Sequence, residues 1–440
     1  MRLTSTKGAV AVATAALTIS TMWSGSASAV QTGAAATAWI GSDQLPALQA
    51  RVNEDGNTLA GTDIDASSGT VHVYAVGSAG TAVAIEAVRS LNQRVTASAG
   101  TGHLIVQVVS VARSSNQLKA QMARVVTAQP WAGGAQGLLS QWYVSPRDNA
   151  LVIGLTDPTP ALRLLARRTF GPSVIVVQRD RSQAMVKRSI ATGARTQQYR
   201  GPLVSATTTA PNRLNDSAPF YGGDRIIYTS ALPNGYTNIE QCTASFVFNQ
   251  PGFGRVMSTA GHCGPNGRAW QQGWFDKPNS RIYENGLMGT DYNTQFGNNR
   301  PDGELLKGGS YAPRVYTSSS GNSPQSSTPR LPSVGEGLCT DGSFTGQNCY
   351  AKVHATNACL NLADNGTVYY VCNQLLLQST NGSVIVQPGD SGGPVYTHNG
   401  TQPQLVAEGI ISGGTSSGQY ANATQVTSFD ATFGVSPVAG

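Results

Sequence analysis

The second half of the chain, from residue 221 onward, consists of short runs in which apolar and polar residues alternate. Examples are RIIYTSAL, CTASFVF, GRVMSTA and AEGIISGG, and Asn-Gly pairs at 285, 365, 381 and 399 predict turns between such runs. The spacing of apolar residues that marks a long helix is absent there. The pattern predicts an all-β sandwich or barrel over residues 221–440.

Residues 30–178 follow a different pattern, in which strand-like runs flank helical ones. Each helical segment lies between two runs of alternating apolar residues. We expect two α+β modules related by a weak internal repeat, each made of a strand, a helix and a strand. The expected elements are 67–77, 82–91 and 103–111 in the first module and 147–157, 159–170 and 173–178 in the second.

Two segments have the composition of processing signals. Residues 1–29 combine basic Arg2 and Lys7, a short apolar stretch and the small residues ASA at 27–29, which predicts a signal peptide cleaved after Ala29. No later stretch is long and apolar enough to span a bilayer. Residues 179–220 are first basic and then rich in Thr, Pro and Ser, and we interpret them as an exposed processing linker.

Composition favours an exported protein. Charged residues make up 12% of the chain and glycine numbers 50, which suits a loop-rich extracellular β protein better than a cytosolic helical enzyme. All six cysteines lie in the second half, and an even count in an exported chain predicts three disulfides. Neither CxxC nor HxxxH spacing occurs, so we expect no metal site.

Charge is divided unevenly along the chain. Residues 1–214 hold 19 Lys and Arg against 9 Asp and Glu, a net charge of +10, whereas residues 215–440 hold 10 against 14, a net charge of −4. The basic residues are dispersed and lack interleaved aromatic residues, which disfavours nucleic-acid binding. The opposite signs predict attraction between the two halves.

Two short motifs carry candidate chemistry. In QPGDSGGPVY (387–396), Ser391 lies between an acid and two glycines. A serine hydroxyl becomes a good nucleophile only beside a base and a group that holds the oxyanion. In STAGHCG (258–264), His262 adjoins Cys263 in a glycine-rich turn, and a disulfide between Cys242 and Cys263 would fix the imidazole. His262 is therefore the candidate base.

The order of these motifs resembles that of the chymotrypsin-like serine proteases. TAGHC is followed about 130 residues later by GDSGGP and then by GIISGG. The signal peptide and the cysteine-free N-terminal half are most similar to the secreted bacterial branch, of the streptogrisin and α-lytic type. The resemblance covers residues 221–440 well and residues 30–200 loosely.

The resemblance implies a fold and a set of roles. The fold is a double six-stranded β-barrel with the active site in the crevice, preceded by an α+β propeptide in residues 30–178. His262 would be the general base and Ser391 the nucleophile, with Asp390 in a structural role. The backbone N–H groups of Gly389 and Ser391 would form the oxyanion hole, and Ser412, Gly413 and Gly414 would pair with the substrate backbone.

The third member of the triad is less evident. An acid must lie between His262 and Ser391, and in the family it precedes apolar residues by three and four positions. Asp302 fits, because Leu305, Leu306 and Lys307 follow it, and Asp291 in TDYNTQF is the alternative. The full set of candidates is Asp276, Asp291, Asp302, Asp341 and Asp364.

The remaining cysteines bear on specificity. GLCTDGSFTGQNCYAKV resembles a family hairpin closed by Cys339–Cys349, which leaves Cys359–Cys372 as the third pair. The family's usual bridge across the specificity loops, with one cysteine on each side of the serine, is missing. Ile385 stands where trypsin-like relatives carry an acid, and Ile411 is also apolar, so we expect cleavage after apolar or aromatic residues.

Together these features predict a secreted serine endopeptidase made as a proenzyme. It would act on polypeptides as a monomer and without a cofactor, and its own N-terminal half would serve as a folding aid and inhibitor. Two alternatives remain: a non-catalytic binding protein on the same fold, and a serine esterase. The esterase motif G-x-S-x-G fits GDSGG formally, but the surrounding βα alternation of esterases is absent.

Overall fold

A computed structural model of the chain describes residues 44–97, 105–128, 139–179, 184–185, 188–192, 197–200, 211–232, 236–264, 266–297, 299–364, 367–398 and 404–440. The predicted signal peptide, the Asn-Gly pairs at 365 and 399, and parts of the predicted linker lie outside these residues. Across the described ranges, no helix combines the length and the apolar character needed to cross a membrane.

The N-terminal half contains two modules with the same order of elements: helix, strand, strand, helix, strand. The predicted strand–helix–strand units are present, as β2–α3–β3 and β5–α5–β6, and the two strands of each unit pair in parallel. Each module also begins with a helix and a strand that the sequence analysis did not identify. The elements are α2 Gln44–Glu54, β1 Leu59–Asp65, β2 Thr70–Val76, α3 Gly77–Ala97 and β3 Ile105–Val111, then α4 Ser115–Ala128, β4 Leu139–Ser145, β5 Ala150–Leu155, α5 Pro160–Phe170 and β6 Ile175–Gln178.

Helix α5 shows how local sequence sets these boundaries. The Thr159 side chain accepts a hydrogen bond from the Leu162 N–H, and Pro160 occupies the first helical position, where a missing N–H costs nothing. Ala166 and Phe170 face the module core, which also contains Trp142 and the Cys359–Cys372 pair. The core of the second module therefore extends into the C-terminal half of the chain.

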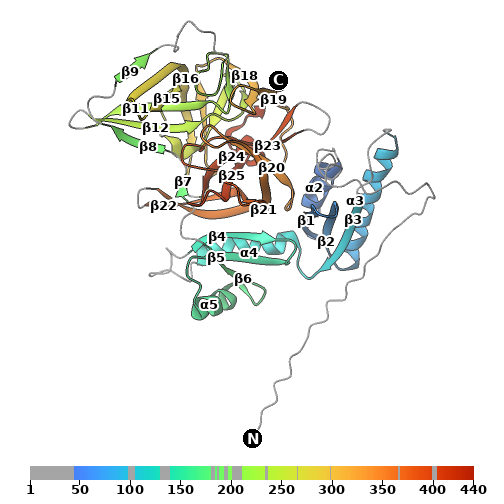
Figure 1. The fold of residues 1–440 in the computed structure, drawn as a ribbon. Coiled ribbons are helices and arrows are strands. Elements are labelled where there is room, and N and C mark those ends of the chain that lie inside the picture. The colour runs from blue at the N-terminus through green and yellow to red at the C-terminus, as the bar shows by residue number, and fades with distance from the viewer. Residues whose placement is uncertain are drawn as a thin grey trace.

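The C-terminal half contains two large β-sheets that fit the predicted double barrel, beside a small three-stranded sheet (Figure 1). The first sheet has the strand order β12-β11-β15-β16-β17-β14-β13, and the second has β20-β23-β24-β25-β22-β21. Strand β20 also pairs with β21, so the second sheet closes into a six-stranded barrel. The first set is β11 Arg225–Ala231, β12 Thr237–Thr243, β13 Val247–Gln250, β14 Gly254–Thr259, β15 Ala269–Asp276, β16 Arg281–Gln295 and β17 Gly303–Lys307, and the second is β20 Gly337–Gly342, β21 Gly346–Asp364, β22 Thr367–Ser379, β23 Pro394–His398, β24 Leu405–Gly414 and β25 Tyr420–Gln425.

Two details of this half differ from the sequence prediction. Asn285 and Gly286 were expected to form a turn, but both lie inside β16, where Gly286 pairs with Gln272 of β15 and Asn285 lies at a shift in the pairing register. A short helix, α6 Val426–Phe433, follows β25, and its Phe429 ring stacks on Phe248 of the first barrel at 5.2 Å between centroids. The remaining strands are β7 Ala184–Met185, β8 Arg188–Thr192, β9 Gln197–Arg200, β10 Phe220–Gly222, β18 Tyr311–Tyr316, β19 Asn322–Pro324 and β26 Ser436–Pro437.

The end of the predicted linker is packed into the C-terminal half. Arg213 is buried, and its guanidinium bonds Asp341 Oδ1 at 2.7 Å and the Ser318 carbonyl at 2.8 Å. The Arg213 carbonyl accepts from the Arg225 N–H of β11. Residues 211–220 therefore differ from the exposed linker expected there, because Arg213 supplies a buried ion pair that joins them to the barrels.

The two halves of the chain share a sheet. Strand β4 pairs antiparallel with β21, with Trp142 opposite Cys359 and Gln141 opposite Leu360, so β4, β5 and β6 continue the second barrel. In Figure 1 these strands run beneath β21 and β22. Farther along, Ala184 and Met185 of β7 pair antiparallel with Gly414 and Gly413 of β24. The N-terminal half is thus paired with two strands of the second barrel, β21 and β24.

Candidate active site

His262 lies in a one-turn 3-10 helix, Gly261–Cys263, directly after β14. The Cys242–Cys263 disulfide joins this turn to β12. The imidazole is buried, and the Phe296 ring lies 5.8 Å from it between centroids. The covalent link and the packing together hold the ring in one position.

Asp302 precedes β17 and bonds His262 twice. Its Oδ2 lies 2.6 Å from His262 Nδ1, and its Oδ1 accepts from the His262 backbone N–H at 2.9 Å. Asp302 is fully buried. This bidentate contact fixes the ring orientation and leaves Nδ1 as the nitrogen that carries a proton toward the carboxylate.

Ser391 lies on the opposite side of the imidazole. Its Oγ is 2.7 Å from His262 Nε2, and its carbonyl accepts from the Thr243 N–H at 2.7 Å. Ser391, His262 and Asp302 are therefore brought together in a single hydrogen-bonded line, with the serine at one end and the carboxylate at the other. Strands β14 and β17 of the first barrel and the turn before β23 of the second barrel position them.

The turn around Ser391 requires glycine on both sides. Gly389 has φ 105° and Gly392 has φ 86°, in the region that other residues seldom adopt. A Cβ on Gly389 would lie 2.1 Å from the Phe344 ring, and one on Gly392 would lie 2.2 Å from the Thr243 carbonyl oxygen. The glycine pattern seen in the sequence thus has both a conformational and a steric cause.

The backbone N–H groups of Gly389 and Ser391 have no backbone carbonyl acceptor within the described part of the chain. The neighbouring Asp390 is buried, and its carboxylate accepts from the backbone N–H groups of Phe344, Thr345 and Gln387 at 2.8 to 3.1 Å. Burial raises the pKa of Asp390 above its ordinary value. The Asp390 carboxylate therefore stabilises the turn by hydrogen bonds, and the backbone N–H groups of Gly389 and Ser391 are left to donate to a bound atom.

The other candidate acids lie in different surroundings. Asp291 accepts from the Arg268 N–H, Asp276 caps a turn by accepting from Asn279, and Asp341 pairs with Arg213. The side chain of Asp364 lies outside the described residues. Of the candidates whose side chains the structure describes, Asp302 is the one that contacts His262.

Ser412, Gly413 and Gly414 form the end of β24. Gly413 and Gly414 pair with β7 of the N-terminal half, so an extended segment already lies along this edge. Ser412 Oγ lies 3.3 Å from Thr424 Oγ1, and Thr424 in turn bonds the backbone of Asp302. The sequence analysis did not single out Thr424, because nothing in ANATQ marks it.

The residues expected to set specificity are apolar and buried. Ile385 and Ile411 belong to one core cluster of the second barrel, together with Val386 and Ala421. A Cβ on Gly414 would lie 2.4 Å from a Val386 methyl group, so Val386 packs directly against the end of β24. These aliphatic residues therefore belong to the barrel core next to the end of β24.

The three disulfides of the described residues are Cys242–Cys263, Cys339–Cys349 and Cys359–Cys372, the pairs expected from the sequence. Within the described ranges, no group of three or more His, Cys, Asp or Glu side chains is placed to hold a metal ion.

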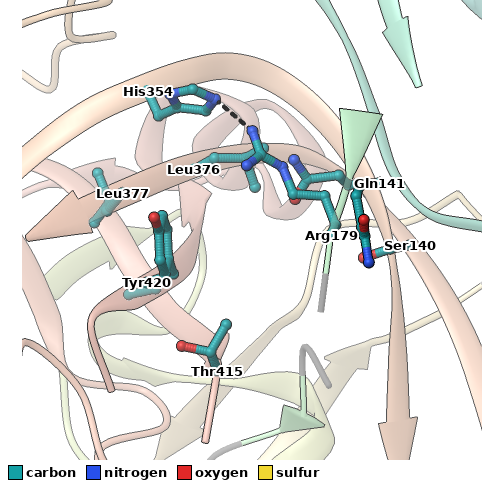
Figure 2. Close-up of a pocket in the computed structure, with 10 residues that line it drawn as sticks. Ser140, Gln141, Arg179, His354, Leu376, Leu377, Thr415 and Tyr420 are labelled. Carbon is teal, nitrogen blue, oxygen red and sulfur yellow. Dashed lines mark hydrogen bonds between the residues drawn. The ribbon is translucent and has the colours of Figure 1, made fainter. Parts of the chain in front are cut away.

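A cavity of about 210 Å³ lies where the N-terminal half meets the second barrel (Figure 2). Ser140, Gln141, Gln178 and Arg179 of the N-terminal half line it, with Thr415, Tyr420 and His354 on the barrel side. Arg179 extends across the cavity, and its guanidinium donates to His354 Nε2 at 3.1 Å. The cavity belongs to the junction and lies just beyond the end of β24.

Comparison with known proteins adds the following findings. No protein-family model matches the chain. Solved structures similar to it include a glutamic-acid-specific serine protease described as using a histidine triad in substrate binding (23% identity, TM-score 0.37) and Thermobifida fusca protease A (22%, 0.37). A Cellulomonas bogoriensis chymotrypsin is 21% identical with a TM-score of 0.35. Each match covers 50% of this chain and 98 to 100% of the other.

Proposed function

We propose that the protein is a secreted serine endopeptidase made as a proenzyme. The observation that carries this proposal is the hydrogen-bonded line from Asp302 Oδ2 through His262 to Ser391 Oγ, with separations of 2.6 and 2.7 Å. A buried nucleophile, base and orienting acid in that order are the parts that acyl transfer requires.

The chemistry follows from this geometry. His262 Nε2 removes the Ser391 proton as Oγ attacks a peptide carbonyl, and Asp302 holds the imidazole in the correct tautomer and stabilises the imidazolium. The N–H groups of Gly389 and Ser391 donate to the oxyanion that forms. His262 then protonates the departing amine, which leaves an acyl group on Ser391, and water releases that group by the same steps in reverse.

The substrate backbone would lie along β24. Ser412, Gly413 and Gly414 would offer main-chain groups to an extended peptide, and Gly413 and Gly414 already pair with β7 of the same chain. The position six residues before Ser391 is the apolar Ile385, and Val386 packs against the end of β24, so we expect an apolar or aromatic side chain before the cleaved bond. A peptide-library profile measures this preference, and dominance of Lys, Arg or Glu would contradict it.

The N-terminal half would act as a propeptide. It continues the sheet of the second barrel through β4, and β7 covers the β24 edge where substrate would lie. Residues 1–214 carry a net charge of +10, of which Arg2 and Lys7 of the signal peptide supply two, so the exported N-terminal half carries +8 against −4 on the other half. These opposite charges draw the two halves together. Barrels rich in non-local contacts fold slowly, so a segment that pairs with β21 would assist folding and then block the cleft.

Maturation would separate the halves between residues 179 and 210. Cleavage farther downstream would remove Arg213, whose side chain is buried against Asp341. Export after Ala29 and a monomeric enzyme acting on polypeptides without a cofactor complete the proposal. N-terminal sequencing and mass measurement of the secreted protein test it, and a mature chain that begins after residue 213 would contradict the placement.

The activity is tested by labelling Ser391 with a fluorophosphonate probe. We expect an adduct on wild-type protein and none on Ser391→Ala, which should fold normally because the change is small.

Asp302→Asn should lower kcat by a factor on the order of 10⁴, the loss seen when the same change is made in a triad of this type. The matched control Asp291→Asn should stay near wild type. No adduct on Ser391 would favour a binding protein, and turnover of simple esters without peptides would favour an esterase.

A further inference from the structure

The backbone of Asp302 is held by one hydroxyl group from the other barrel. Thr424 Oγ1 accepts a hydrogen bond from the Asp302 N–H at 3.1 Å and donates one to the Asp302 carbonyl at 2.8 Å. Thr424 lies in β25 of the second barrel and is fully buried, as is Asp302. Both backbone polar groups of the acid therefore depend on this side chain.

The orientation of the Thr424 hydroxyl is itself fixed. A hydroxyl offers one donor and two acceptor positions. Asp302 uses the donor and one acceptor position, and Gln374 Nε2 of β22 donates to the other at 2.9 Å. The second hydrogen of that Gln374 amide goes to the Cys372 carbonyl at 3.2 Å. Ser412 Oγ is a fourth, longer neighbour at 3.3 Å. Rotation of the hydroxyl toward it would break the shorter buried hydrogen bond to the Asp302 carbonyl.

The position of this contact relates it to the triad. Asp302 belongs to the first barrel, whereas Ser391 and β24 belong to the second, and β25 pairs with β24 along its length. The carboxylate of Asp302 makes both of its contacts with His262 at 2.6 and 2.9 Å. A shift of the Asp302 backbone would therefore move the carboxylate relative to the imidazole and to Ser391.

We propose that Thr424 is a positioning residue of the active site, which fixes the catalytic acid to the barrel that carries the nucleophile. Gln374 supports it by fixing the hydroxyl. The proposal rests on the proposed protease function, but the geometry that it concerns is measurable without turnover.

The test compares Thr424→Val with Thr424→Ser. Valine keeps the shape and removes the hydroxyl, and a displacement of the acid by about 1 Å lowers the rate about 100-fold. We expect that loss in kcat with little change in KM, and a pH–rate profile whose acid limb moves to lower pH because a displaced carboxylate stabilises the imidazolium less. Serine retains the hydroxyl and should restore both the rate and the profile.

A readout independent of turnover separates this proposal from the proposed function. In the Ser391→Ala background, we expect the proton in the short hydrogen bond between His262 Nδ1 and Asp302 Oδ2, at 2.6 Å, to give a downfield NMR resonance. We expect Thr424→Val to shift or broaden it and Thr424→Ser to preserve it. Failure of Ser391 to react with a fluorophosphonate would overturn the protease function and leave this result intact.

The matched control is Thr397→Val, which removes another buried hydroxyl of the second barrel, bonded to Glu408 at 2.7 Å. It should lower thermal stability and leave the pH profile and the resonance unchanged. If Thr424→Val behaves in the same way, Thr424 has only a structural role. If the valine variant does not fold, the same measurements are made on Gln374→Met, which removes the amide donor that fixes the Thr424 hydroxyl. An unchanged pH profile and an unchanged resonance in Gln374→Met would equally overturn the proposal.

Discussion

Two carboxyl groups lie buried behind the catalytic turn, on neighbouring strands of the first barrel. Glu304 of β17 accepts from Trp270 Nε1 at 3.2 Å, and Asp291 of β16 accepts from the Arg268 N–H. Burial, and then the charge of Asp291, raise the pKa of Glu304 well above its ordinary value. Burial also raises the pKa of Asp291. Glu304 therefore binds its proton more tightly in the folded protein than in the unfolded chain.

This predicts a stability that falls as the solution becomes alkaline. A raised pKa in the folded state stabilises the fold at low pH, and that stabilisation is lost as pH rises through the raised value. Glu304→Gln keeps the size and the hydrogen-bonding groups but does not ionise. We expect its melting temperature, measured from pH 5 to 9 in the Ser391→Ala background, to fall less steeply than that of the parent protein.

The matched control for this change is Glu86→Gln on the exposed face of α3. Exposed carboxylates contribute little to stability, so its melting curve should follow the parent at every pH. If Glu304→Gln also follows the parent throughout, then Glu304 is already ionised in the folded protein and the argument from burial is wrong.

At the residue scale, the sequence analysis identified those site residues that lie in recognisable motifs of neighbouring residues. Ser391 and His262 lie in short motifs, and Asp302 was favoured by Leu305 and Leu306, which are buried on β17. What separates Asp302 from Asp291 is a contact with His262, 40 residues away. Thr424 was missed for the same reason, because its partner lies 122 residues earlier.

At the scale of elements, the sequence analysis predicted the helices and strands whose apolar residues recur with a clear period. It missed those in which this period is weak or conflicts with a local turn signal. Helix α2 carries buried Leu45, Leu48 and Val52 at helical spacing, a signal that was present but not used. Asn285 and Gly286 were read as a turn, yet Asn285 Nδ2 donates to Gln272 and to the Leu214 carbonyl inside the sheet. Tertiary partners override the local turn preference there.

Two disulfides differ in what they hold in place. Cys242–Cys263 joins β12 to the turn that carries His262, whereas Cys359–Cys372 closes the β21–β22 hairpin on which β4 packs. Their sequence separations are 21 and 13. In the chain-entropy view, loops of these lengths are each worth about 3 kcal/mol of stability.

We therefore predict similar losses of stability and different losses of activity. Replacing Cys242 and Cys263 by alanine should lower both the melting temperature and kcat, because the imidazole is no longer held. Replacing Cys359 and Cys372 should lower the melting temperature and leave kcat of the folded enzyme near wild type. Equal losses of kcat in the two double variants would contradict the separate roles.

At the scale of the whole molecule, the junction between the halves is both a shared sheet and a charged contact. His354 of β21 lies at this junction, and Tyr143 and Arg179 of the N-terminal half meet its Nε2 at 2.9 and 3.1 Å. Figure 2 shows the contact with Arg179. Lys352 of the same strand adds positive charge, and Asp148 of the N-terminal half adds one negative charge. Tyr420 of β25 lines the same cavity.

Burial and then the charges of Arg179 and Lys352 lower the pKa of His354 from 6.5 to about 4. The neutral ring accepts from Arg179, whereas a protonated ring would repel it. Because the pKa is lowered in the folded protein, docking of the N-terminal half on the second barrel is strongest above pH 6.5 and weakens as pH falls toward 4.

Hydrogen exchange of the full-length Ser391→Ala protein measures this docking, with rates corrected for the intrinsic effect of pH. Protection of β4 and of its partner residues in β21 should fall over that range in the parent protein and stay constant in His354→Gln, which accepts from Arg179 without titrating. The control His398→Gln changes a histidine of β23 outside this cavity and should behave as the parent. If His354→Gln loses protection with the parent, another group drives release and His354 only fills space.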